Sequence, residues 1–310
     1  MTQDLFSKKK MIDEFLTGIA YHHSSFSFVN IFIWSDFFDF RFEIINDYLC
    51  VFATHELGCF LYLPPFKKYA EGKFFARKKM GKNFLLTVEE CFKIMRKENR
   101  SPSVSRIENV TLRESELFGV DQFSFFQKSY EYCYFKEDLI NLKGNALKSK
   151  RGAFNHFVKS YPCEFLPFSQ EMILECLSLY DQWSKNRLER STDEVYNHMI
   201  QENRSVHEKA MRYYRDLGLI GRVVLVKGKI VGYSFGFPLN SQTFCILFEI
   251  TQLGFFGLSV FLFSKFCEDP QLEGYEFINA MDDFGMKNME AAKMSFRPSV
   301  LLPSYVITAL

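Results

Sequence analysis

A long apolar stretch in the second half of the chain places the strongest constraint on its fold. Residues 230–248 include no charged side chain, and a stretch of this length could cross a membrane as a helix. Pro238 and the polar residues 240–242 interrupt it near its middle, and such residues favour a turn. The stretch therefore predicts a buried β-hairpin rather than a membrane helix.

The flanking sequence extends this hairpin into a meander that follows a layer of helices. Three strands are expected at residues 219–226, 230–238 and 243–250, with a tight turn at residues 227–229. Apolar residues at helical spacing predict a helix over residues 169–184. Ser191 and Ser205 are each followed three residues later by Glu, which predicts the first turns of two further helices.

The two halves of the chain show the same order of elements. After the meander we expect an apolar helix ending at Cys267, a strand at 275–280, a short helix at 286–294 and a last strand at 297–306. The first half predicts a helix at 25–38, strands at 40–45, 48–54 and 59–63, a helix opened by Thr87, a strand at 104–109 and strands near Phe123 and Tyr132. This order indicates a duplicated α+β unit, with domains at residues 1–140 and 141–310. Each half would hold a mixed, mainly antiparallel sheet flanked by helices.

Composition agrees with two globular domains and excludes several classes of protein. The 310 residues are 47% hydrophobic and 24% charged, with a net charge of +1, so the chain as a whole is not drawn to nucleic acid or anionic membranes. The eight Cys show no Cys-x-x-Cys pair and the six His show no metal spacing, which favours reduced thiols and no metal site. No signal peptide or transmembrane segment is evident, so we expect a cytoplasmic protein.

Four segments together resemble a known family. They are SFSFVNIFIWSDFF (25–38), LINLKGNALKSKRGAFNHF (139–157), FEIT (248–251) and INAMDDFGMKNMEAAKMSFRP (278–298). They are similar to the C-terminal domain of phosphatidylglycerol lysyltransferase. The resemblance implies a tandem of two acetyltransferase-like (GNAT) folds. It also implies transfer of an aminoacyl group from aminoacyl-tRNA to a lipid head group.

Glu249 is the candidate catalytic residue. It is the only charged residue between Lys229 and Lys265, and a carboxylate inside a central strand is costly unless it is paired or faces a cleft. It could act as a general base or hold an ammonium group. The alternative is a structural carboxylate paired with a basic residue from the other layer. Gln252 stands where the lipid-modifying relatives have arginine, which weakens the case for the lysyl-lipid reaction.

Two groups of residues are candidates for substrate binding. Lys143, Lys150, Arg151 and Asn155 belong to a basic segment that could contact donor phosphates or a carboxylate. The resemblance places Arg151 and Asn155 at the interdomain cleft. A solvated basic helix is the alternative. Asp282 and Asp283 could bind the amino group of the acceptor or of an aminoacyl donor, whereas capping of the following helix is the expected role of at least one of them. Gln252 and Asn279 are further candidates for substrate binding.

Two other segments give weaker signals. A basic and aromatic run from Lys67 to Lys82 could bind RNA or form a solvated loop. The turn between Gly254 and Gly257 lacks the usual acyl-CoA pattern, so binding of CoA has little support.

The first functional hypothesis is an aminoacyl-transfer acyltransferase without a cofactor. It would move an aminoacyl group from aminoacyl-tRNA to an amine or hydroxyl on a small molecule or lipid head group, with tRNA as a partner. The alternatives are a CoA-dependent N-acyltransferase and a non-catalytic binding protein that retains the duplicated fold.

Overall fold

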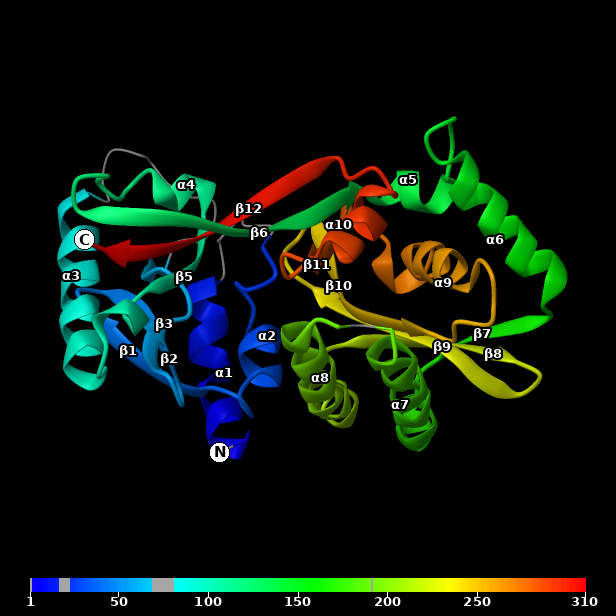
Figure 1. Cartoon of the computed structure of the whole chain (residues 1–310), viewed down its shortest axis with the longest axis horizontal. Helices are drawn as coiled ribbons and strands as arrows, with labels where there is room; N and C mark the ends of the chain where they lie inside the picture. Colours follow the sequence, from blue (N-terminus) through cyan, green and yellow to red (C-terminus); the bar gives the residue numbers. More distant parts are fainter. Residues whose placement is uncertain (1, 17–22, 69–80, 191) are drawn as a thin grey trace. The chain divides into compact units, whose positions relative to one another are not determined.

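The computed structural model describes residues 2–16, 23–68, 81–190 and 192–310, and the chain divides into two compact units (Figure 1). Unit 1 holds Met1–Glu131, Asp282–Met286 and Leu301–Leu310. Unit 2 holds Tyr132–Met281 and Lys287–Val300. Two long strands, β6 (Phe123–Phe135) and β12 (Val300–Ala309), have residues in both units. Both units combine helices with a mixed, mainly antiparallel sheet, as predicted.

Unit 1 is built on a meander closed by strands from distant parts of the chain. Its helices are α1 (Thr2–Leu16), α2 (Phe28–Ile33), α3 (Gly81–Glu98) and α4 (Leu112–Ser115). Its strands are β1 (Asp39–Ile45), β2 (Tyr48–His55), β3 (Gly58–Leu61), β4 (Phe66–Lys67) and β5 (Ile107–Thr111), and the order is β1-β2-β3-β5-β12-β6, with β4 beside β2. The β3–β5 pair is parallel, whereas β5 and β12 pair antiparallel.

Unit 2 carries the second meander between two layers of helices. Its helices are α5 (Lys136–Asn141), α6 (Lys148–Ser160), α7 (Ile173–Leu188), α8 (Glu194–Arg212), α9 (Leu258–Cys267) and α10 (Lys287–Met294). Its strands β11 (Phe277–Asp282), β10 (Thr243–Thr251), β9 (Lys229–Pro238), β8 (Ile220–Val226) and β7 (Cys163–Pro167) lie side by side in that order. Only the β10–β11 pair is parallel among the pairs of β7 to β11.

The same turn chemistry forms the first hairpin of both meanders. Lys227 and Gly228 join β8 to β9 with φ of 53° and 72°, and Asn46 and Asp47 join β1 to β2 with φ of 51° and 66°. Two successive residues with positive φ make the tight turn whose twist matches that of paired strands. The predicted three-strand meanders are therefore confirmed in both halves.

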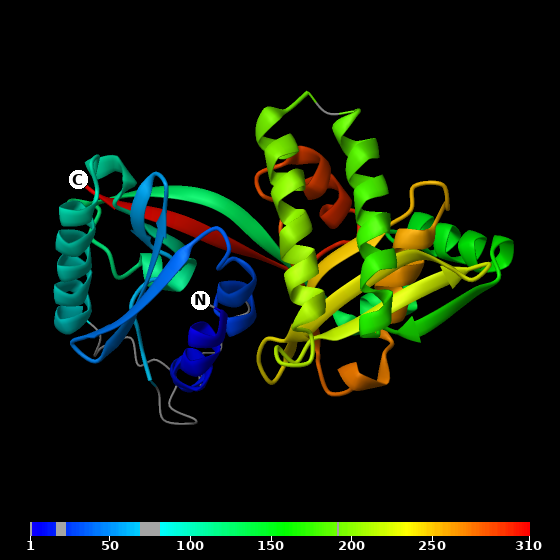
Figure 2. The same cartoon turned by 90° about the horizontal axis from the view of Figure 1, so that it is seen from below.

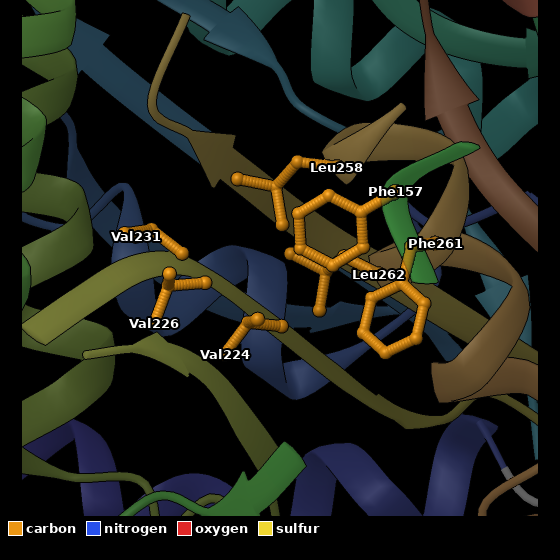
Figure 3. Packing of buried hydrophobic residues seen from close by; sticks show 7 residues of the cluster. All are labelled: Phe157, Val224, Val226, Val231, Leu258, Phe261 and Leu262. Carbon is orange, nitrogen blue, oxygen red and sulfur yellow. The ribbon is translucent and has the colours of Figure 1, made fainter. Parts of the chain in front are cut away.

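Helices cover both faces of the sheet in unit 2. Helices α7 and α8 pack together on one face, whereas α9 and α6 lie on the other (Figures 1 and 2). The core on the α9 face joins α6, α9, β8 and β9 (Figure 3), and its buried residues are Phe157, Val224, Val226, Val231, Leu258, Phe261 and Leu262. Burial of each such side chain contributes roughly 1.5–3 kcal/mol, so this core fixes α6 against the sheet.

Two predicted helix starts are wrong. Thr87 lies inside α3, where its Oγ1 donates to the carbonyl of Asn83 (2.8 Å). Ser205 lies inside α8, which is one continuous helix begun by the N-cap Asp193. A Ser/Thr-x-x-Glu pattern also fits a helix interior, because the hydroxyl can bond to a carbonyl of the preceding turn. Ser191 lies outside the described residues.

Other boundaries also differ from the prediction. Only Phe28–Ile33 of the segment 25–38 is helical, with Ser27 as its N-cap. The two strands expected near Phe123 and Tyr132 are one strand, β6. Helix α1 was not predicted. Its large apolar residues fall into two groups that Lys8, Lys9 and Lys10 separate, so its helical period is interrupted.

Candidate functional site

Glu249 lies on β10 beside the fully buried Ser234 of β9, with which it is paired in register. A bulge between Ile246 and Phe248 inserts one residue into β10 before this pair. Such an insertion shifts the alternation of side chains along the strand. The bulge therefore decides which face of the sheet receives Glu249.

The face of Glu249 is the one covered by α9. Phe248, the preceding residue, stacks on His207 of α8 with ring centroids 3.9 Å apart, so Phe248 faces α8. Neighbouring residues of a strand point to opposite faces, which turns Glu249 away from α8. The charge of Glu249 raises the pKa of Cys267 on α9, in addition to the larger effect of burial on that thiol.

The Glu249 carboxyl group is held in an environment that favours its protonated form. Its Oε2 is buried and has no hydrogen-bond partner among the described residues, although the residue as a whole is only half-buried. Burial raises the pKa of Glu249 from 4.5 to about 8. No lysine or arginine of the described segments forms an ion pair with it. Glu249 is thus an acid that keeps its proton at neutral pH and gives it up slightly above.

Aromatic rings pack together on the α8 face of β10. The Tyr233 hydroxyl lies 3.0 Å from Nδ1 of His207, and burial lowers the pKa of His207 to about 3. The ring is therefore neutral at neutral pH and packs as an aromatic residue against Phe248. His207 was not among the predicted residues. The available signal was its position on the buried stripe of α8 with Val206, Ala210 and Met211.

Two of the four candidates in the basic segment make structural contacts. Arg151 donates from Nη1 to the carbonyls of Leu142 (2.5 Å) and Gly144 (3.2 Å), and so closes the loop between α5 and α6. Lys150 lies over the ring of Phe296, with Nζ 4.1 Å from its centroid, and burial lowers the pKa of Lys150. Only Lys143 and Asn155 of this group have exposed side chains.

The remaining candidates are spread over different surroundings. Asn279 is buried, pairs in register with Cys245 and accepts from the backbone of Met281 (2.5 Å). Cys245 pairs with Phe237, which is three residues from Ser234, so Asn279 and Glu249 lie on opposite faces of the sheet.

Gln252 is exposed, and its backbone N–H donates to the carbonyl of Val231 (2.8 Å). In the described structure, no hydrogen bond or ion pair joins Glu249 to any of the eight predicted binding residues.

The two aspartates do not cap α10. Asp283 accepts from the backbone of Gly285 (2.8 Å), and Asp282 accepts from the hydroxyl of Ser129 (3.2 Å). Helix α10 begins at Lys287, too far along the chain for either carboxylate to be its N-cap. The capping alternative is therefore wrong, because the chain first makes a turn with positive φ at Phe284 and Gly285.

The basic run at Lys67 to Lys82 lies mostly outside the described residues. Of its described part, Lys67 lies over the Tyr48 ring (4.5 Å), and Lys68 forms an ion pair with Glu14 (2.8 Å). Within the described ranges, no helix has the length and apolar character needed to cross a membrane.

Comparisons with known proteins agree on one family and one fold. The profile of the family described as "Phosphatidylglycerol lysyltransferase, C-terminal" matches residues 17–308. A conserved protein of unknown function from Bacteroides thetaiotaomicron has a similar structure (TM-score 0.80, 23% identity, 98% of this chain and 97% of that chain). The C-terminal domain of a putative lysylphosphatidylglycerol synthetase from Agrobacterium fabrum is also similar (TM-score 0.63, 12% identity, 99% of this chain and 92% of that chain).

The duplicated architecture also has a match. A tandem GNAT protein from the clavulanic acid biosynthesis pathway has a TM-score of 0.51 at 7% identity, covering 99% of this chain and 95% of that chain. The predicted tandem GNAT-like α+β fold is therefore confirmed. No curated protein matches the sequence.

Proposed function

Because the chain belongs to the family of phosphatidylglycerol lysyltransferase C-terminal domains, we propose that it transfers an aminoacyl group from aminoacyl-tRNA to an amine or hydroxyl acceptor. The family match over residues 17–308 carries the proposal. The raised pKa of Glu249 supports the proposal, since an unpaired carboxyl group with a pKa of about 8 is suited to exchange protons near neutral pH.

The reaction needs one proton acceptor that later becomes a donor. The acceptor nitrogen or oxygen attacks the carbonyl carbon of the aminoacyl ester and must lose a proton as the new bond forms. The bond to the ribose oxygen of the tRNA then breaks, and that oxygen must gain a proton. In this proposal the Glu249 carboxylate takes the first proton and returns it to the leaving oxygen.

The surroundings of Glu249 fit this role. Its buried Oε2 accepts no hydrogen bond from the described segments, so no protein donor competes with the acceptor for this oxygen. On the opposite face, Phe248 of β10 is stacked on His207 of α8. An acceptor that arrives as an ammonium ion would favour the carboxylate form of Glu249 and lower its pKa, since opposite charges favour ionisation. Such an acceptor must first release one proton to solvent, because only the neutral amine can attack the ester.

Glu249→Gln tests the proposal. Transfer of a labelled aminoacyl group should fall by at least about a hundredfold in this variant, because the amide cannot accept the proton. Glu273→Gln is the matched control, since Glu273 is an exposed glutamate of the same unit and its replacement should leave transfer unchanged. Undiminished transfer by Glu249→Gln would remove Glu249 from the reaction.

The choice of donor separates this proposal from the two alternatives. The purified protein would be supplied in parallel with a set of aminoacyl-tRNAs and with acetyl-CoA, together with amine and hydroxyl acceptors. Transfer from aminoacyl-tRNA alone supports the proposal. Transfer from acetyl-CoA alone would establish the CoA-dependent reaction instead, and binding of a donor without turnover would establish a binding protein.

A further inference from the structure

Two cysteine thiols of unit 1 touch in the interior of the fold. Cys91 of α3 donates from Sγ to the Sγ of Cys50 on β2, and the two sulfur atoms are 3.5 Å apart. Both residues are 0% exposed. Cys50 in turn donates to the carbonyl oxygen of Tyr48 (3.7 Å). The transfer reaction proposed above uses neither thiol, so the pair is a feature that this reaction does not explain.

Helix α3 is held on the sheet on both sides of this contact. One turn before Cys91, the hydroxyl of Thr87 accepts from the side-chain amide of Asn46 in the β1–β2 turn (3.2 Å). Just after the helix, the Asn99 side chain accepts from the backbone N–H of Cys59 on β3 (2.6 Å) and donates to its carbonyl (2.7 Å). These contacts hold α3 in register with the sheet, so the two sulfur atoms stay adjacent.

The two sulfur atoms are close to the separation of a covalent bond. A disulfide bond is about 2.0 Å long, so the sulfur atoms of Cys50 and Cys91 must approach by about 1.5 Å. Each sulfur lies one bond beyond Cβ, and small rotations about the Cα–Cβ bonds can cover this distance while the backbone stays in place. The folded chain therefore places these two thiols for formation of a disulfide.

We propose that Cys50 and Cys91 form an oxidative modification site, at which a hydroperoxide converts the two thiols into a disulfide that ties α3 to β2. Two thiols that meet across a helix and a strand are suited to this role, because the bond would join parts of unit 1 that are distant in sequence. This inference goes beyond the proposed transfer reaction and does not depend on it.

The reaction consumes one hydroperoxide and no other reagent. One thiol loses its proton to water and attacks an oxygen of the peroxide, and the O–O bond breaks. This step leaves a sulfenic acid, and the other oxygen takes up the proton and leaves as water or an alcohol. The second thiol then attacks the sulfenic sulfur, whose hydroxyl group leaves with the proton of that thiol as water. With hydrogen peroxide, two thiols and one peroxide thus give one disulfide and two waters.

The reduced pair is the resting state of this site. The hydrogen bond to Cys50 and burial both raise the pKa of Cys91, and the thiolate, not the thiol, is the form that attacks a peroxide. The pair is buried, so a peroxide reaches it only when α3 opens briefly from the sheet. Oxidation is therefore slow, and the site responds to sustained exposure to peroxide.

Peptide mapping of the full chain tests the proposal. The native protein is incubated with hydrogen peroxide, its remaining thiols are alkylated, and it is digested without a reducing agent. The digest should contain a linked pair of peptides that carry Cys50 and Cys91, and dithiothreitol should separate them.

Thermal unfolding gives a second measurement. The Tm of the oxidised protein should exceed that of the reduced protein by at least about 3 °C, because a bond that closes a loop of about 40 residues restricts the unfolded chain. Dithiothreitol should remove this gain, which distinguishes the disulfide from oxidation of methionine.

Two variants separate this pair from other buried thiols. Cys91→Ala should abolish both the linked peptides and the gain in Tm. Cys176→Ala combined with Cys245→Ala is the matched control, because these two cysteines are also 0% exposed, and it should keep both effects of peroxide. Thermal unfolding of each variant establishes that it is folded, and the peptide map of the native protein needs no variant.

The proposal is overturned if peroxide leaves Cys50 and Cys91 unlinked in the folded native protein, or if it links either of them to a different cysteine instead. It is also overturned if the linked protein unfolds at or below the Tm of the reduced protein, because the bond would then not fit the packing of α3 on β2. None of these measurements involves aminoacyl transfer, so failure of this inference and failure of the proposed function are distinguishable.

Discussion

At the scale of single residues, Glu249 combines burial with the absence of a charge partner. A carboxyl group in such a place either keeps its proton or destabilises the fold when it loses it. The raised pKa of about 8 means that the folded protein holds a proton that the unfolded chain releases near pH 4.5. Glu249 therefore favours folding fully at low pH, and this contribution declines as the pH rises from about 4.5 to about 8.

Glu249→Gln should remove this dependence, because glutamine cannot ionise. The stability of the variant relative to the native protein should rise between about pH 5 and pH 8 by about 1–3 kcal/mol and level off above. The difference in Tm across this range measures it. Glu273→Gln, at an exposed position, should show no such trend. A constant difference for Glu249→Gln would show that Glu249 is ionised in the fold.

At the scale of elements, the approach of the β10–α9 turn to α6 depends on one glycine. Gly257 has a positive φ, and a side chain there would collide with the backbone of Ala153. Gly254 lies three residues earlier in the same turn and has no positive φ, and a Cβ at this position would have no other atom within 4 Å. These two glycines therefore separate the effect of close packing from that of replacing a glycine in this turn.

Gly257→Ala should destabilise the protein by about 2–4 kcal/mol, because it combines strain in the backbone with a displaced helix. Gly254→Ala should change stability by less than about 0.5 kcal/mol. Urea unfolding midpoints measure both. Equal effects at the two positions would show that the turn does not pack on α6 as described.

At the scale of the whole molecule, local patterns predict the meanders and miss what depends on distant contacts. Strand alternation and the Lys227–Gly228 turn identify their hairpin without any tertiary information, and the isolation of Glu249 is visible as a single charge in a long apolar stretch. The bulge at Ile246 to Phe248 leaves no such sign, although it decides which face Glu249 occupies.

Other features could not be predicted because their partners are set by the folded chain. In the sequence Arg151 resembles a free cation, but it bonds to carbonyls of the preceding loop. Unit 1 includes residues 282–286 and 301–310 from the far end of the chain. Contacts between residues so far apart in sequence leave no pattern in either segment that would predict them. The division at residue 140 therefore stays a prediction from element order alone.

The central claim is that Glu249 accepts the proton released by the acceptor, and the pH dependence of a single turnover of aminoacyl transfer tests it most directly. Only the carboxylate can accept a proton, so the rate should rise about tenfold per pH unit below the pKa of Glu249 and level off above it. Glu273→Gln should follow the native profile, and Glu249→Gln should be slow at every pH. A native rate that does not change between pH 5 and pH 9, or a Glu249→Gln variant with the native profile, would contradict the account.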